Sequence, residues 1–239
     1  MGKISKTLKT RIDALLLRMY LHSPFSRPLF ANYFLKLVWY SRLRQWCRQH
    51  PCSESEWRPG LYRDLVASEH LDGPIDYLEF GVYKGWSINF WLGLNNHHES
   101  RFYGFDTFTG LPEDWHKMPK GTFSTQGNLP DVSDSRCHFI KGLFQDTLPV
   151  FLKDYVSSSR KVIHCDADLF SSTLFVLGSL GPLLRAGDIL IFDEFDRWLH
   201  EFRAFIDFLE MYPIRYEAIR RAANWTQVAI RIESDTLTL

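Results

Sequence analysis

Four acidic side chains follow two short apolar runs in the second half of the chain, and they are the residues best suited to chemistry. Asp166 and Asp168 follow the run KVIHC, and Asp193 and Glu194 follow the run DILIF. Carboxylates that gather in one place are costly unless a cation or a proton neutralises them. Their oxygens suit Mg²⁺ or Ca²⁺, and such an ion lowers the pKa of a hydroxyl that it binds. The four acids therefore predict a metal-assisted site that activates a hydroxyl group.

Such a site also needs a base that takes the proton of the hydroxyl. Asp168 is the first choice, and His116 and His200 are the alternatives, although a surface or packed position is the plainer interpretation of either histidine. The acids also have structural interpretations. Asp193 or Glu194 could cap the following helix, and Asp166 or Asp168 could pair with an arginine such as Arg197.

A glycine-containing turn follows an earlier apolar run, at residues 75–80. Gly81 and Gly85 allow a tight backbone turn there, but the spacing differs from the GxGxxG pattern of dinucleotide sites. Glu79 precedes the turn and would repel a phosphate, whereas it could hold an ammonium group. Asp106 lies 21 residues after Gly85, where a carboxylate can accept hydrogen bonds from ribose hydroxyls. A cationic nucleoside without phosphate, such as S-adenosylmethionine, satisfies both features.

Short apolar runs alternate with helical patterns after residue 60, which predicts an α/β fold with a mostly parallel, doubly wound sheet. Two final runs have no helix between them, so we expect an antiparallel edge strand. The expected strands cover residues 75–80, 101–106, 137–141, 161–165, 188–192, 215–219 and 227–232. Ligands of such sheets lie beyond the carboxyl ends of the strands, where the acids and the glycine turn would meet.

Residues 1–60 are predicted to form a basic helical appendage, and residues 61–239 the main domain. Residues 1–50 contain ten basic residues and one acidic residue. We expect this appendage to cover the acceptor pocket as a lid and to mediate a homodimer, with weak membrane-surface contact through residues 1–50. The alternative is a solvated helix face that packs on the acidic remainder of the chain.

The composition is that of an ordinary globular protein, with 45% hydrophobic and 23% charged residues. The four cysteines have no CxxC spacing and suggest free thiols in a reducing compartment, so a cytoplasmic location is expected. The apolar stretch 28–40 is too short to be a transmembrane segment. The acidic main domain disfavours nucleic acid as a partner.

Several motifs resemble one known family. They are YLEFGVYKGWS (77–87), FDTFTGLPEDW (105–115), FIKGLFQDTLP (139–149), HCDADLFSST (164–173), IFDEF (191–195) and NWTQVAIR (224–231). In their order and spacing the chain resembles the macrocin and mycinamicin O-methyltransferase family of class I methyltransferases. The resemblance implies a Rossmann-like, seven-stranded sheet that binds S-adenosylmethionine.

Together with the glycine turn, the resemblance predicts a set of cofactor contacts: Glu79, Gly81, Tyr83, Gly85, Ser87, Asp106, Thr107, Phe108, Gly142, Phe144 and Asp166. Characterised members bind magnesium through three acids, which correspond to Asp166, Asp193 and Glu194. The third ligand is usually aspartate in the family, whereas Glu194 stands at that position in this chain. The loop 112–135 is shorter than in the antibiotic enzymes, where it carries a proposed histidine base, and His116 lies in it.

The predicted function is S-adenosylmethionine-dependent transfer of a methyl group to a hydroxyl of a small molecule, sugar or glycan. One alternative is a non-catalytic module that keeps the nucleoside site and binds a partner. A nucleotide-linked oxidoreductase is disfavoured by the missing GxGxxG pattern.

Overall fold

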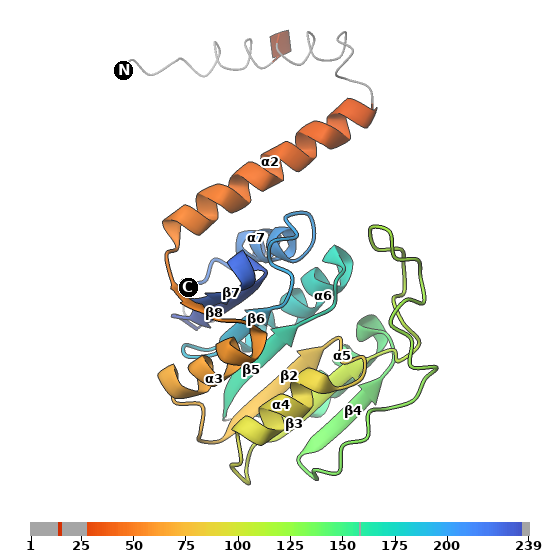
Figure 1. Cartoon of the computed structure of the whole chain (residues 1–239), viewed down its shortest axis with the longest axis vertical. Coiled ribbons are helices and arrows are strands. Elements are labelled where there is room, and N and C mark those ends of the chain that lie inside the picture. Colours follow the sequence, from red (N-terminus) through yellow and green to blue (C-terminus); the bar gives the residue numbers. More distant parts are fainter. Residues whose placement is uncertain (1–13, 16–27, 158, 236–239) are drawn as a thin grey trace. The chain divides into compact units, whose positions relative to one another are not determined.

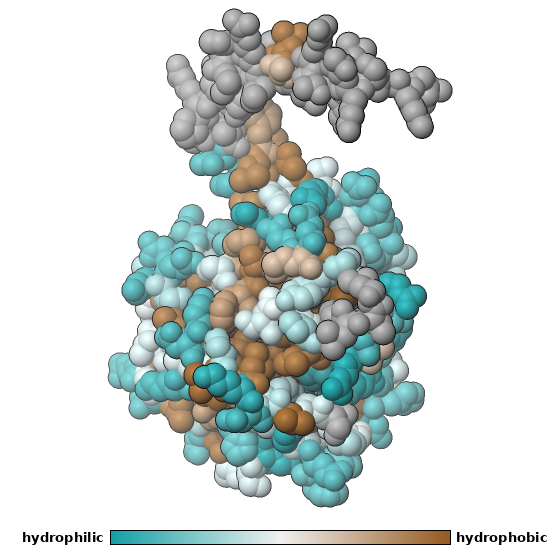
Figure 2. All heavy atoms as spheres, turned by 180° about the vertical axis from the view of Figure 1, so that it is seen from behind, coloured by the Kyte–Doolittle hydropathy of each residue, from teal (hydrophilic) through white to brown (hydrophobic). Residues whose placement is uncertain are grey.

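The structure is a computed structural model that describes residues 14–15, 28–157 and 159–235. The chain divides into two compact units, residues 1–44 and 45–239. Most of the N-terminal helical segment expected before residue 28 lies outside the described residues. Helix α2 (Pro28–Gln49) begins at a proline, which fits the first turn because its missing N–H has no helical partner there. Side chains of α2 such as Tyr33, Leu37 and Val38 are exposed, and Figure 2 shows hydrophobic residues along this helix.

The second unit is built on one eight-stranded sheet with the order β1-β7-β8-β6-β5-β2-β3-β4. The strands are β1 (Ser53–Ser55), β2 (Ile75–Phe80), β3 (Arg101–Asp106), β4 (Cys137–Lys141), β5 (Arg160–Cys165), β6 (Ile189–Phe192), β7 (Tyr216–Ala222) and β8 (Gln227–Ile232). Strand β8 runs antiparallel to β6 and β7, and all other neighbouring strands are parallel. The predicted α/β class, with a mostly parallel sheet and an antiparallel pairing toward its edge, is confirmed.

The prediction of seven strands is wrong, because β1 pairs with β7 at the end of the sheet. Its sequence, Ser-Glu-Ser, has no alternation of apolar and polar residues that could identify it as a strand. Ion pairs attach this part of the chain to β7. Arg221 lies 2.7 Å from Glu54, and Arg220 lies 3.2 Å from Asp64.

Five helices cover the sheet: α3 (Arg58–Ser68), α4 (Trp86–Leu94), α5 (Phe144–Asp154), α6 (Phe170–Leu180) and α7 (Glu201–Met211). Helix α3 contacts α4, and α6 contacts both α5 and α7. In Figure 1, α4 lies in front of strands β2 and β3, and α5 lies behind them. All six residues of β2 are buried, as expected for a central strand covered on both faces.

The strand order brings the carboxyl ends of β6, β5, β2 and β3 to one edge of the sheet. This edge carries Asp193, Asp166, Gly81 and Asp106, each of which follows or ends its strand. Chemistry-bearing residues that lie far apart in the sequence therefore meet at the place where such sheets bind ligands. Among the described residues, no helix combines the length and the hydropathy that crossing a membrane requires.

Candidate active site

A cavity of about 330 Å³ opens at the carboxyl edge of the sheet, which is within the usual range for small-molecule sites. The β2–α4 turn and the first residues of α4 form one wall. The ends of β3, β5 and β6 form the floor, and the start of α5 and a loop residue, Phe123, complete the wall. Most of the predicted cofactor contacts line the cavity, namely Gly81, Tyr83, Ser87, Asp106, Thr107, Phe144 and Asp166.

Glu79, Gly85, Phe108 and Gly142 are not among the lining residues. Glu79 is fully buried, and its carboxylate accepts hydrogen bonds from the Tyr77 hydroxyl at 2.7 Å and from Ser87 Oγ at 2.6 Å. The carboxylate predicted to touch the cofactor thus supports a residue that lines the cavity.

The glycine turn approaches the end of β5 very closely. Gly81 has a φ of 97°, and a Cβ atom placed on it would lie 1.8 Å from the carbonyl oxygen of Asp166. No side chain fits at that separation, so the turn requires glycine at this position.

Asp106 holds this turn from the other side. Its Oδ2 atom accepts hydrogen bonds from the backbone N–H groups of Val82 and Tyr83 at 2.8 and 2.7 Å. Its Oδ1 atom accepts one from the N–H of Phe108 at 2.7 Å. The predicted ribose-binding carboxylate lines the cavity, and it is fixed by the same turn that it stabilises.

The acidic edge holds a cationic side chain that the sequence did not predict as part of the site. Arg58, at the start of α3, donates through Nη2 to Oδ2 of Asp166, and its Nε atom lies 2.9 Å from Oδ1 of Asp193. The same Nε atom donates to the hydroxyl of Tyr62 at 2.9 Å, and the guanidinium lies 5.6 Å from the ring centroid of Trp86. The alternative interpretation, in which Asp166 or Asp168 pairs with an arginine such as Arg197, holds for Asp166, whose partner is Arg58.

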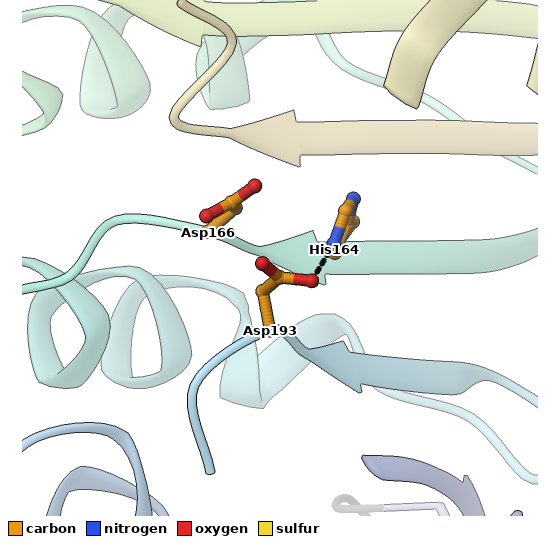
Figure 3. Close-up of side chains that lie close together, drawn as sticks. All are labelled: His164, Asp166 and Asp193. Carbon is orange, nitrogen blue, oxygen red and sulfur yellow. Dashed lines mark ion pairs between the residues drawn. The ribbon is translucent and has the colours of Figure 1, made fainter. Parts of the chain in front are cut away.

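The three acids predicted as metal ligands all line the cavity, but the tightest cluster has a different third member. Ligand atoms of His164, Asp166 and Asp193 lie within 4.8 Å of one another. Figure 3 shows the two carboxylates at the ends of β5 and β6, with His164 Nε2 4.0 Å from Asp193 Oδ1. Glu194 instead lies 4.0 Å from Arg197. Burial raises the pKa of Glu194 to about 7, and the nearby Arg197 partly opposes this shift.

As arranged, these residues do not fit a resident Mg²⁺. Mg²⁺ demands near-octahedral oxygen coordination, whereas one of the three clustered groups is an imidazole. Both carboxylates are already ion-paired with the guanidinium of Arg58. This arrangement therefore provides no metal-dependent catalytic step.

Asp168 lines the cavity beside this edge and has an unusual backbone conformation. Its φ is 60°, and the N–H of Leu169 donates to the carbonyl of Ala167 at 2.6 Å, which closes a three-residue turn around Asp168. Such turns are strained and recur where a side chain is held for function. Burial, then the charges of Glu194, Asp166 and Asp106, raise the pKa of Asp168 to about 8.

His116 and His200 lie together but are not among the residues that line the cavity. Their ring centroids are 4.8 Å apart, and both rings contact Trp115. Burial and the neighbouring His116 lower the pKa of His200 to about 4, so His200 is neutral near pH 7. Of the three predicted bases, Asp168 is the one that lines the cavity.

Known proteins resemble this chain in the region that builds the cavity. Residues 78–195 match the family model described as a methyltransferase domain. Demethyldecarbamoylnovobiocin O-methyltransferase from Streptomyces niveus is 27% identical over 143 residues, which cover 51% of this chain and 53% of that protein. The chain thus matches about half the length of this curated relative.

Two solved structures share the fold. A calicheamicin methyltransferase has a TM-score of 0.56 at 23% identity, covering 96% of this chain and 94% of that one. The O-methyltransferase NovP has a TM-score of 0.57 at 21% identity, covering 74% and 79%. The predicted Rossmann-like methyltransferase fold is confirmed, with one strand more than expected.

Proposed function

We propose that this chain is an S-adenosylmethionine-dependent O-methyltransferase that acts on a hydroxyl of a small molecule, sugar or glycan. The observation that carries the proposal is the unit formed by the glycine turn and Asp106, which builds one wall of the cavity inside the region matching a methyltransferase domain. The named relatives, a novobiocin O-methyltransferase and a calicheamicin methyltransferase, support an acceptor of the natural-product or sugar class.

S-adenosylmethionine, when bound, supplies a methyl group that is open to attack by a nucleophilic oxygen. The chain's own residues have to align that oxygen and keep water away. Asp106 and the turn would hold the nucleoside, and Trp86 and Phe123 add apolar surface to the cavity wall. Asp168 would accept the proton of the acceptor hydroxyl, since its raised pKa is close to the working pH of a general base.

Magnesium has no part in this mechanism, because Arg58 already pairs with two of the three acids predicted to bind it. Membership of the macrocin and mycinamicin group, a cytoplasmic location, a homodimer and a lid formed by residues 1–60 stay predictions, as does the absence of nucleic acid partners. The non-catalytic alternative is not favoured, because the matched proteins are named as methyltransferases.

The experiment is a turnover assay with the full chain. The protein is incubated with S-adenosylmethionine and a panel of hydroxylated sugars and phenolic natural products, and S-adenosylhomocysteine and methylated product are both quantified. Product that forms with wild type and is lost in Asp168→Asn supports the proposal. Asp207→Asn is a matched control, because Asp207 lies on α7 and pairs with Arg203 away from the cavity lining. Binding of the nucleoside without turnover of any acceptor would favour the non-catalytic alternative.

A further inference from the structure

The acidic edge of the cavity is costly unless a cation or a proton offsets its charge. Asp166 and Asp193 follow β5 and β6, whose last residues, Cys165 and Phe192, are register partners. The side chain of Asp193 is 9% exposed and that of Asp166 is 23% exposed, so water screens their mutual repulsion poorly. Burial and the charge of Asp166 raise the pKa of Asp193 well above its usual range, and the charge of Arg58 already opposes this shift. A cation between the two carboxylates would relieve this cost.

Arg58 supplies that cation from within the chain. Its Nη2 atom donates to Asp166, whereas its Nε atom donates to the hydroxyl of Tyr62 and lies 2.9 Å from Oδ1 of Asp193, so the guanidinium charge is close to both carboxylates. An arginine stays charged at every physiological pH, so its positive charge is permanent. The contacts with Tyr62 and Trp86 hold the guanidinium in place from helices α3 and α4.

The unexpected strand β1 fixes the segment that delivers Arg58. Ser55, the last residue of β1, is three positions before Arg58, and its hydroxyl donates to Asp64 of α3 at 2.6 Å. Asp64 also pairs with Arg220 of β7. The start of α3 is thereby tied to the sheet, which limits the positions that the guanidinium can adopt.

We propose that Arg58 takes the place of the divalent metal ion in this site, so that its single positive charge offsets part of the charge of Asp166 and Asp193 and no Mg²⁺ is bound. Where this concerns catalysis it rests on the proposed function, and it leaves proton removal to Asp168. Arg58 is then a positioning residue, because it fixes the carboxylates that form the floor of the cavity.

The test measures metal binding directly, with Mn²⁺ as a paramagnetic probe titrated into the full-length protein. We expect no specific Mn²⁺ site in wild type, nor in Arg58→Lys, which keeps the charge. Arg58→Ala should bind one Mn²⁺ at least tenfold more tightly than wild type, and Arg58→Ala combined with Asp193→Asn should lose that site. Arg63→Ala is the matched control, since Arg63 is an exposed arginine on the same helix that lies over Phe90.

A wild-type Mn²⁺ site that Asp193→Asn removes would overturn the proposal, as would an Arg58→Ala protein that folds but gains no site. If Arg58→Ala does not fold, the wild-type and Arg58→Lys titrations still decide. A second measurement compares S-adenosylhomocysteine affinity of wild type in Mg²⁺ and in EDTA, and we expect equal values. A tenfold loss in EDTA would contradict the role of Arg58, whereas no binding in either buffer would contradict the proposed function and leave the Mn²⁺ result interpretable.

Discussion

A Cβ atom on Gly81 would lie 1.8 Å from the carbonyl oxygen of Asp166, so the end of β2 passes directly against the end of β5. From the other side, the carboxylate of Asp106 at the end of β3 accepts the N–H groups of Val82 and Tyr83 in the same turn. Three strand ends are thus joined at the cavity through contacts that involve the backbone. A change at this junction should act on ligand binding before it acts on the rest of the fold.

Replacing Gly81 with alanine should lower the affinity for S-adenosylhomocysteine at least tenfold. The added methyl group meets backbone atoms, and a φ of 97° costs a residue with a side chain about 1–3 kcal/mol. Calorimetric titration and thermal unfolding of the variant measure both effects. Gly93→Ala is the control, because Gly93 lies in the α4 helix that follows the turn and a Cβ atom there would meet nothing within 4 Å. Equal affinities of the two variants would show that the turn does not shape the site.

Methyl transfer should depend on the protonation of Asp168. Since its pKa is raised to about 8, the carboxyl is protonated below that pH and cannot accept a proton, so kcat/KM should increase with pH and level off above it. The positive charge of the bound methyl donor favours the carboxylate, so kcat should level off at a lower pH. Asp168→Asn should reduce kcat by about 10²–10⁴ and remove this increase, whereas Asp207→Asn should keep it. An Asp168→Asn variant that keeps the wild-type profile would exclude Asp168 as the base.

Stability should fall as pH rises from acidic to mildly alkaline values. The pKa values of Asp168 and Glu194 are raised to about 8 and about 7, so the folded protein binds these protons more tightly than the unfolded chain does. Their contribution is complete below the unfolded pKa values near 4 and is lost as pH passes through the folded ones. The Tm of wild type, followed by differential scanning fluorimetry, should decrease as the pH rises through the folded pKa values. The Tm of Asp168→Asn should decrease less over the same pH range. A wild-type Tm that increases steadily from about pH 5 to about pH 8 would contradict these pKa shifts.

Glu79→Gln should destabilise the fold by about 1–3 kcal/mol, because an amide group replaces an oxygen that accepts a buried hydrogen bond. Both carboxylate oxygens of Glu79 accept hydroxyl hydrogens, one from Tyr77 and one from Ser87. Urea unfolding measures the change, and Glu99→Gln is an exposed control that should be neutral. If the two variants are equally stable, the buried network around Glu79 contributes little to folding.

The sequence predicts the central strands because β6 is a continuous apolar run and β2 and β5 are short runs with apolar residues at their centres, which is typical of strands buried on both faces. It also predicts which residues meet at their ends, since parallel strands deliver successive acids to one edge. Strand β1 escapes prediction because Ser-Glu-Ser carries no periodic signal and is held by pairing with a distant strand.

Arg58 is the main site residue that the sequence interpretation missed. It lies at the end of a polar link, more than 100 residues before both of its carboxylate partners, and no spacing rule connects them. The proline that follows it, at the first turn of α3, is a signal for a helix start. That signal could have placed Arg58 at a helix terminus, but its pairing depends on the tertiary fold. Glu79, another motif position near the cavity, is fully buried, and its role as a cofactor contact stays a prediction.

The most direct test of the central claim is a calorimetric titration of the full-length chain with S-adenosylhomocysteine, carried out in EDTA. We expect saturable one-to-one binding at micromolar affinity, and a loss of affinity of at least tenfold in Gly81→Ala. No binding heat from wild-type protein that is folded would contradict the assignment of the cavity as a methyl-donor site.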